Sequence, residues 1–140
     1  MKKLKFTISN LVVKSIYEYC AHTCYETGVD AQYSYMLYKN MQILEQAYID
    51  IVKRSYIEER DAEYMEYTEQ LNAIDVSNTA DIEKLKLSYK DVIQRHDTQC
   101  EKNKQILAEC NEFELYALST TEMPEHVAPK MRTLFGIAFY

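Results

Sequence analysis

The chain has 140 residues, of which 47% are hydrophobic, so it can fold around a buried core. Its formal net charge of -6 argues against a general nucleic-acid binder, because such a protein needs a basic surface to displace counterions from phosphates. No apolar run approaches the roughly 18 residues of a membrane span, and the segment after the N-terminal lysines is too polar for a signal peptide. We therefore expect a cytoplasmic protein that contacts neither a membrane nor nucleic acid directly.

The first two predicted elements are short. Residues 3–8 alternate charged and apolar side chains, which predicts a half-buried strand. Ser9 or Asn10 can then cap a helix over residues 10–27. This helix should end near Gly28, because glycine readily adopts the left-handed conformation that terminates helices.

Residues 30–74 contain neither Gly nor Pro and predict one long helix, capped by Asp30 and roughly 65 Å in length. The first half is apolar on two sides, so we expect residues 37–52 to form the centre of the core. The second half keeps a single apolar stripe, displaced by about a quarter turn from the first. A bend or interruption is therefore predicted near residues 57–61.

A polar turn at residues 75–79 precedes a third predicted helix over residues 79–111. Its seam residues follow one another in steps of three and four, which is typical of antiparallel packing against a second helix. The seam consists of Ile82, Leu85, Tyr89, Val92, Ile93, His96, Cys100, Asn103, Leu107 and Cys110.

The C-terminal region changes pattern again. Residues 112–118 alternate in the manner of a strand that could pair with residues 3–8, and Pro129 suits the start of a short helix over residues 129–136. We therefore predict a single all-α or mostly α domain over residues 1–140. It would combine a long antiparallel helical hairpin, a short N-terminal helix and a two-stranded pairing of the chain's two end segments.

The last residues are apolar and would seldom be left in water. They either dock on the core of this chain or form a contact with another chain. The candidate oligomer contacts are Phe135, Ile137, Phe139 and Tyr140.

No catalytic pattern is present. The chain lacks a Gly-x-Ser-x-Gly elbow, and with glycine only at positions 28 and 136 it has no loop that could cradle a phosphate. We expect no enzyme activity, no catalytic residues and no cofactor.

The four cysteines are expected to be thiols rather than two disulfides, because a cytoplasm is reducing. Cys20 and Cys24 are four residues apart, as are His96 and Cys100, so two helices could supply a four-ligand zinc site. The alternative, which we favour, is that these side chains are core residues and that the protein binds no metal.

An acidic stretch is the remaining candidate site. Residues 50–75 hold eight acids against three bases, with tyrosines between them. The stretch is either an ordinary solvated helix surface or a negative patch that occupies the basic nucleic-acid groove of a partner protein. The candidate partner-binding residues are Glu58, Glu59, Asp61, Glu63, Tyr64, Glu66, Tyr67 and Gln70.

The order of these features resembles a group of small helical tailed-phage proteins of uncharacterised function. The resemblance lies in the start Lys2-Lys3-Leu4-Lys5-Phe6, the capped helix, the long hairpin rich in Tyr and Glu, and the segments Glu112-Phe113-Glu114-Leu115 and Met123-Pro124. It implies a phage or prophage origin and brings no catalytic residues with it.

The expected function is binding to a protein of the host or the phage, as an acidic inhibitor of a host nuclease or defence complex acting in the host cytoplasm. The alternative is a minor virion or assembly protein that forms homo-oligomers through its helical hairpin and apolar tail. A third hypothesis is a metal-dependent enzyme or sensor built on the cysteine and histidine set.

Overall fold

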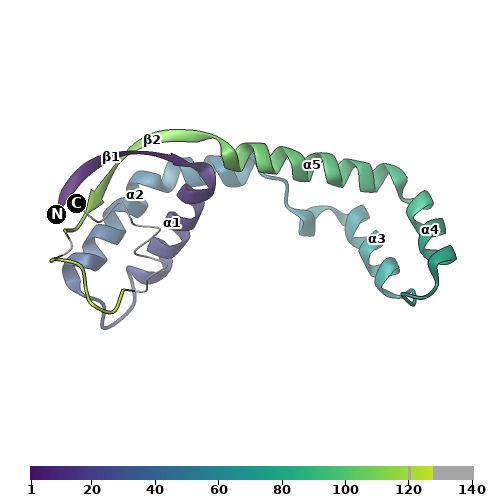
Figure 1. The fold of residues 1–140 in the computed structure, drawn as a ribbon, viewed down its shortest axis with the longest axis horizontal. Coiled ribbons are helices and arrows are strands. Elements are labelled where there is room, and N and C mark those ends of the chain that lie inside the picture. Colours follow the sequence, from purple (N-terminus) through teal and green to yellow (C-terminus); the bar gives the residue numbers. More distant parts are fainter. Residues whose placement is uncertain (120, 128–140) are drawn as a thin grey trace. The chain divides into compact units, whose positions relative to one another are not determined.

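The structure is a computed structural model, and it describes residues 1–119 and 121–127. Within these residues the mostly α fold and the antiparallel pairing of two strands are confirmed. The elements in chain order are β1 (Lys2–Ser9), α1 (Asn10–Thr23), α2 (Ala31–Arg54), the 3-10 helix η1 (Glu58–Arg60), α3 (Ala62–Asn72), α4 (Thr79–Ser88), α5 (Lys90–Ala108) and β2 (Cys110–Ala117) (Figure 1).

The chain folds into two compact units. The first, which we call the ribbon unit, holds Met1–Arg54 and, of the described residues, 106–119 and 121–127. The second, the hairpin unit, is Ser55–Gln105. None of the helices in the described part of the chain is both long and apolar enough to cross a membrane.

The ribbon unit is named for its two strands, which lie along α1 and α2 (Figure 1). β1 pairs with β2 in a register that places Leu4 opposite Leu115 and Phe6 opposite Phe113. Phe6, Phe113 and Leu115 lie in or against the core, whereas Lys5 and Glu112 form an ion pair on the outside. The alternation seen in the sequence therefore sets which face of the ribbon is buried.

The core of the ribbon unit lies between α1, α2 and β2. The expectation that residues 37–52 form its centre is supported, since Leu37, Leu44 and Ile51 are almost fully buried. The other members are Val13, Ile16, Cys20, Tyr33, Met36, Leu115, Leu118, Met123 and Val127. The two apolar sides of α2 are explained by α1 and the ribbon, which it contacts simultaneously.

Asn40 is the polar exception in this core, and only 1% of its surface is exposed. Its side-chain oxygen accepts the backbone N–H of Tyr116 at 2.7 Å, and its Nδ2 donates to the carbonyl oxygen of Tyr116 at 2.9 Å. Asn40 thus acts towards β2 as a neighbouring strand would. Both of its polar groups are satisfied, which removes the usual cost of burying an amide.

The predicted helix starts are confirmed by their caps. Ser9 accepts the backbone N–H of Val12, and Asp30 accepts that of Tyr33 at 2.9 Å. The end of α1 differs from the prediction, because the helix stops at Thr23 rather than near residue 27. Gly28 has a φ of 83° and lies in the loop beyond the helix end.

The interruption predicted near residues 57–61 is confirmed, and it divides residues 30–74 into separate helices. α2 ends at Arg54, η1 follows, and α3 begins after Asp61. Two polar side chains explain the break. Asn103 donates to the carbonyl oxygen of Tyr56 and accepts its N–H, at 2.9 and 2.8 Å, and Asp61 caps α3 by accepting the N–H of Tyr64.

The helix predicted over residues 79–111 is also divided, with α4 ending before Tyr89 and α5 beginning after it. At Tyr89 the backbone has a φ of -109°, and its N–H is shared between two carbonyl oxygens of the preceding turn. The strand predicted over residues 112–118 starts two residues earlier, at Cys110. The helix predicted over residues 129–136 lies outside the described residues.

The antiparallel hairpin itself is confirmed within the hairpin unit, where side chains of α3 and of the segment before it contact α5 and Tyr89. Tyr56 contacts Asn103, Tyr64 contacts His96, and Tyr67 contacts Tyr89. Later residues of the first segment thus contact earlier residues of the second, which is the order of an antiparallel pair. The predicted seam therefore faces α3 and the segment before it. Its last two members belong to the ribbon unit instead, where Leu107 packs on the core and Cys110 is exposed.

Candidate partner-binding face

The eight candidate residues lie in η1, in α3 and at Asp61 between them, and they divide into two groups. Asp61, Tyr64 and Tyr67 contact α5 or Tyr89 in the hairpin interior. Glu58, Glu59, Glu63, Glu66 and Gln70 are exposed. Three of the exposed residues also reach this interior, since Glu58 bonds to His96, Glu63 lies 3.7 Å from Arg95 and Gln70 donates to Tyr89.

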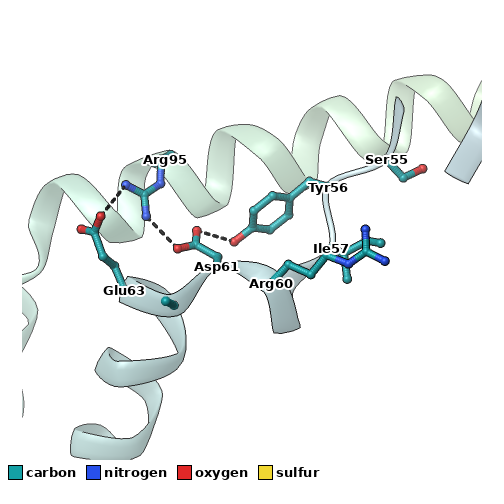
Figure 2. A pocket seen from close by; sticks show the side chains of 8 residues that line it. Ser55, Tyr56, Ile57, Arg60, Asp61, Glu63 and Arg95 are labelled. Carbon is teal, nitrogen blue, oxygen red and sulfur yellow. Dashed lines mark hydrogen bonds and ion pairs between the residues drawn. The ribbon is translucent and has the colours of Figure 1, made fainter. Parts of the chain in front are cut away.

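Asp61 is the centre of the interior network, and only 9% of its side chain is exposed. One carboxylate oxygen accepts the hydroxyl of Tyr56 at 2.8 Å, and the other accepts a guanidinium N–H of Arg95 at 2.8 Å (Figure 2). The hydrogen bond from Tyr56, the α3 backbone N–H and the charge of Arg95 together hold the pKa of Asp61 below its usual range. Asp61 therefore stabilises the hairpin unit through contacts made by both of its carboxylate oxygens.

His96 forms the second part of the network. Its ring is stacked on Tyr64 with centroids 3.7 Å apart and planes 3° from parallel, and the Tyr56 ring lies in a T-shaped arrangement with it, with centroids 5.8 Å apart. Its Nε2 lies 3.0 Å from Glu58, and its Nδ1 lies 3.3 Å from Asp97. Burial lowers the pKa of His96, but the two carboxylates more than offset this, so that the pKa is raised above the ordinary value of 6.5.

At the far end of α3 the contacts are aromatic. The rings of Tyr67 and Tyr89 have centroids 5.5 Å apart, and Gln70 donates to the hydroxyl of Tyr89 at 2.9 Å. Two hydrophobic residues of this unit are buried, Tyr67 and Val92. The hairpin unit is thus held mainly by rings and polar contacts rather than by an aliphatic core.

An open pocket of about 440 Å³ lies beside Asp61. Tyr56, Asp61 and Arg95 form one wall and Arg60 another, and Figure 2 shows the chain of contacts from Tyr56 through Asp61 and Arg95 to Glu63. The charged groups at this wall largely neutralise one another, so the pocket offers no strong selection for a charged small ligand.

Sequence reasoning missed Arg95, whose partner Asp61 lies 34 positions earlier in the chain. No local pattern links two such residues. A signal did exist for Asp61, because an aspartate directly before a segment free of Gly and Pro is a good helix N-cap.

The charge of the chain is concentrated in the hairpin unit, which carries twelve Asp and Glu against seven Lys and Arg. Its net charge of -5 accounts for most of the chain's -6. Within the unit, residues 55–75 hold seven acids and one base, whereas residues 76–105 hold five acids and six bases. η1 and α3 therefore present the most negative surface segment of the molecule.

The zinc-site alternative gains no support from the described residues, in which no three His, Cys, Asp or Glu side chains gather closely enough to hold a metal ion. Cys20 and Cys24 belong to the ribbon unit, and His96 and Cys100 to the hairpin unit. Burial raises the pKa of Cys20 to about 12, so this thiol is poorly suited to become a thiolate ligand.

The candidate oligomer contacts Phe135, Ile137, Phe139 and Tyr140 lie outside the described residues.

Comparisons of the chain with protein-family models, with curated proteins and with solved structures gave no match.

Proposed function

We propose that this is a small phage-encoded protein-binding protein that contacts a basic surface of its partner through the acidic face of η1 and α3. The phage origin rests on the resemblance in the order of the sequence elements. The binding role rests on the charge of the hairpin unit and on how its carboxylates are used.

The observation that carries the proposal is the separation of inner from outer carboxylates on one short segment. The carboxylate of Asp61 already accepts hydrogen bonds from Tyr56, Arg95 and the first turn of α3. Glu59 and Glu69, by contrast, form no ion pair with any described residue. Glu63 lies 3.7 Å from Arg95 with 65% of its side chain exposed, and a surface pair of this kind contributes little to stability. The outer acids are thus available to a partner without loss of the fold.

A basic groove that normally holds nucleic acid is the partner surface that suits this face best. The exposed acids spaced along η1 and α3 can meet such a groove. The proposed partner is therefore a host nuclease or a host defence complex, which the protein would inhibit by blocking the groove. No catalytic step by this chain is needed.

A second candidate function is a minor virion or assembly protein that forms homo-oligomers through the hairpin. It is favoured by two strongly exposed apolar side chains of the hairpin unit, Val76 at 88% and Leu87 at 74% exposure. The tail with Phe135 would add to such a contact. Light scattering at high protein concentration tests this candidate, because a monomer would contradict it.

The main experiment compares two charge-reversed baits in affinity purification from a host lysate. The double variant Glu59→Lys with Glu66→Lys alters the proposed face, whereas Glu83→Lys with Glu101→Lys makes the same charge change on α4 and α5 of the same unit. We expect the first pair to lose a nucleic-acid-binding partner that the wild type and the second pair retain.

The salt dependence of that complex provides the second readout. Binding should weaken steeply as salt is raised, because exposed charges are screened at a Debye length of about 8 Å near physiological ionic strength. Equal loss of the partner in both double variants, or a complex that is insensitive to salt, would contradict the proposed face.

A further inference from the structure

The hairpin unit contains a thiol and an imidazole in direct contact. Cys100 lies one turn after His96 on α5, and its Sγ is 3.5 Å from Nε2 and 4.0 Å from Nδ1 of that ring. Cys100 is half-buried, so its sulfur is shielded from bulky reagents and yet not sealed in a core. A base within reach of a thiol is the first requirement of a nucleophilic cysteine.

Other groups fix the imidazole in place. Asp97 lies 3.3 Å from Nδ1 and Glu58 lies 3.0 Å from Nε2, so the ring has a carboxylate on each nitrogen. Tyr64 is stacked on one face of the ring, and Tyr56 meets it edge-on. A nucleophilic cysteine also needs groups that hold its base in the right orientation. Here two carboxylates and two aromatic rings orient the imidazole.

The two carboxylates raise the pKa of His96, so the imidazolium persists to higher pH than in a free histidine. A neighbouring imidazolium stabilises a thiolate, which is the reactive form of cysteine. Tyr56 and Tyr64 are also neighbours of the thiol, and burial raises the pKa of both phenols further above the ordinary value, so neither is charged near pH 7.

We propose that Cys100 is a nucleophilic thiol, activated by His96, that is modified by small uncharged electrophiles such as hydrogen peroxide. The thiolate sulfur attacks one peroxide oxygen, so that an S–O bond forms and the O–O bond breaks. The sulfur is oxidised to a sulfenic acid and the peroxide is reduced. The departing hydroxide takes the proton of the imidazolium and leaves as water.

The remaining cysteines provide contrast within the same chain. Cys20 is fully buried, and burial raises the pKa of both Cys20 and Cys24. Cys110 is exposed, and its sulfur contacts the carbonyl oxygen of Ala108 at 3.6 Å. Since Cys110 is the more accessible thiol, accessibility alone predicts that it reacts faster than Cys100. Activation by His96 predicts the reverse order.

The test measures the alkylation rates of Cys100 and Cys110 by iodoacetamide in the folded full chain at pH 6, by mass spectrometry of digests. We expect Cys100 to react about fivefold faster than Cys110, because the His96 imidazole lies against its sulfur. After exposure to hydrogen peroxide, a sulfenic-acid trap such as dimedone should label Cys100 ahead of Cys110. A Cys100 rate equal to or below that of Cys110 overturns the proposal.

Variants separate activation from exposure. His96→Phe keeps a ring against Tyr64 and should lower the Cys100 rate to or below that of Cys110, while the Cys110 rate stays unchanged. Asp97→Asn is a milder second variant for the case in which His96→Phe loses its helical circular dichroism, and it should lower the Cys100 rate with the helices intact. An unchanged ratio of the two rates in a folded variant would show that His96 does not activate the thiol.

Discussion

At the scale of single residues, the contacts that define this fold are made by buried or half-buried polar side chains. Asn40 satisfies both backbone groups of Tyr116, and Asn103 does the same for Tyr56. Each amide replaces a missing stretch of regular backbone pairing. Substituting either asparagine leaves two backbone polar groups without hydrogen-bond partners. The loss in folding free energy is then larger than the contribution of the two hydrogen bonds alone.

We therefore predict that Asn40→Leu destabilises the ribbon unit by about 2–4 kcal/mol, because two backbone groups of β2 lose their partners at a buried site. Urea unfolding followed by circular dichroism measures this. Gln46→Leu, at an exposed position on the same helix, is the matched control and should change stability by less than about 0.5 kcal/mol. Similar effects of the two substitutions would contradict the role given to Asn40.

His96 makes the stability of the hairpin unit depend on pH. Its pKa is raised in the folded state, so the stabilising contribution of the imidazolium is complete below the unfolded value of 6.5 and is lost as pH rises through the folded pKa. We expect the melting temperature of the hairpin unit to fall when pH is raised from 6 to 8. NMR titration of His96 should give a midpoint above 6.5.

The Glu58→Gln variant should shift that NMR midpoint downwards, because it removes the carboxylate bonded to Nε2. Glu59→Gln is the control, since this neighbouring carboxylate is exposed and should leave the midpoint in place. A wild-type midpoint at or below 6.5 would contradict the assigned ion pair.

At the scale of elements, Asp61 decides that α2 and α3 are separate helices. Its carboxylate starts α3 and at the same time binds Tyr56 and Arg95. These contacts place the start of α3 at the position where the apolar stripe of the sequence shifts.

We predict that Asp61→Ala destabilises the hairpin unit by about 2 kcal/mol, of which the lost cap accounts for about half. Asp61→Asn keeps a capping oxygen but removes the charge that pairs with Arg95, so it should cost about 1 kcal/mol. Thermal unfolding of both variants measures the difference. If Asp61→Asn were as damaging as Asp61→Ala, the cap would contribute nothing.

The elements also show what sequence patterns can and cannot reveal. The strands, the start of α1 and the start of α2 were predictable because their signals are local: alternation in residues 3–8, Ser9 before one helix and Asp30 before the other. The break near residues 57–61 was predicted from the shift of the apolar stripe, but its exact bounds and the break at Tyr89 were not, because they depend on partners far away in the chain. Asn103 forms hydrogen bonds with Tyr56, which lies 47 positions earlier in the sequence. Gln70 forms one with Tyr89, which lies 19 positions later.

The same distinction applies to the candidate face. The acidic composition of η1 and α3 is visible in the sequence, and so is the tyrosine content. Which carboxylates turn inward is not visible, since Asp61 and Glu58 are set apart from Glu59 only by Arg95 and His96 on another helix. The contact of Cys100 with His96, in contrast, follows from a spacing of four residues on one helix.

At the scale of the whole molecule, the two units differ in what holds them together. The buried aliphatic cluster lies entirely in the ribbon unit, whose core residues come from both ends of the chain. The hairpin unit carries most of the net charge and relies on rings and ion pairs. This division favours a stable scaffold with an inserted segment that is free to specialise in binding.

The last prediction follows from that division. A variant in which a short Gly-Ser linker replaces Ser55–Gln105 should still fold, because no member of the aliphatic core is removed. The two cut ends remain tied by Arg54, which donates to both carboxylate oxygens of Glu109 at 2.8 and 2.7 Å. We expect a cooperative thermal transition and a dispersed NMR spectrum, with no binding to the partner of the intact chain. A variant with helical signal but no cooperative transition would mean that the ribbon unit needs the hairpin unit to pack.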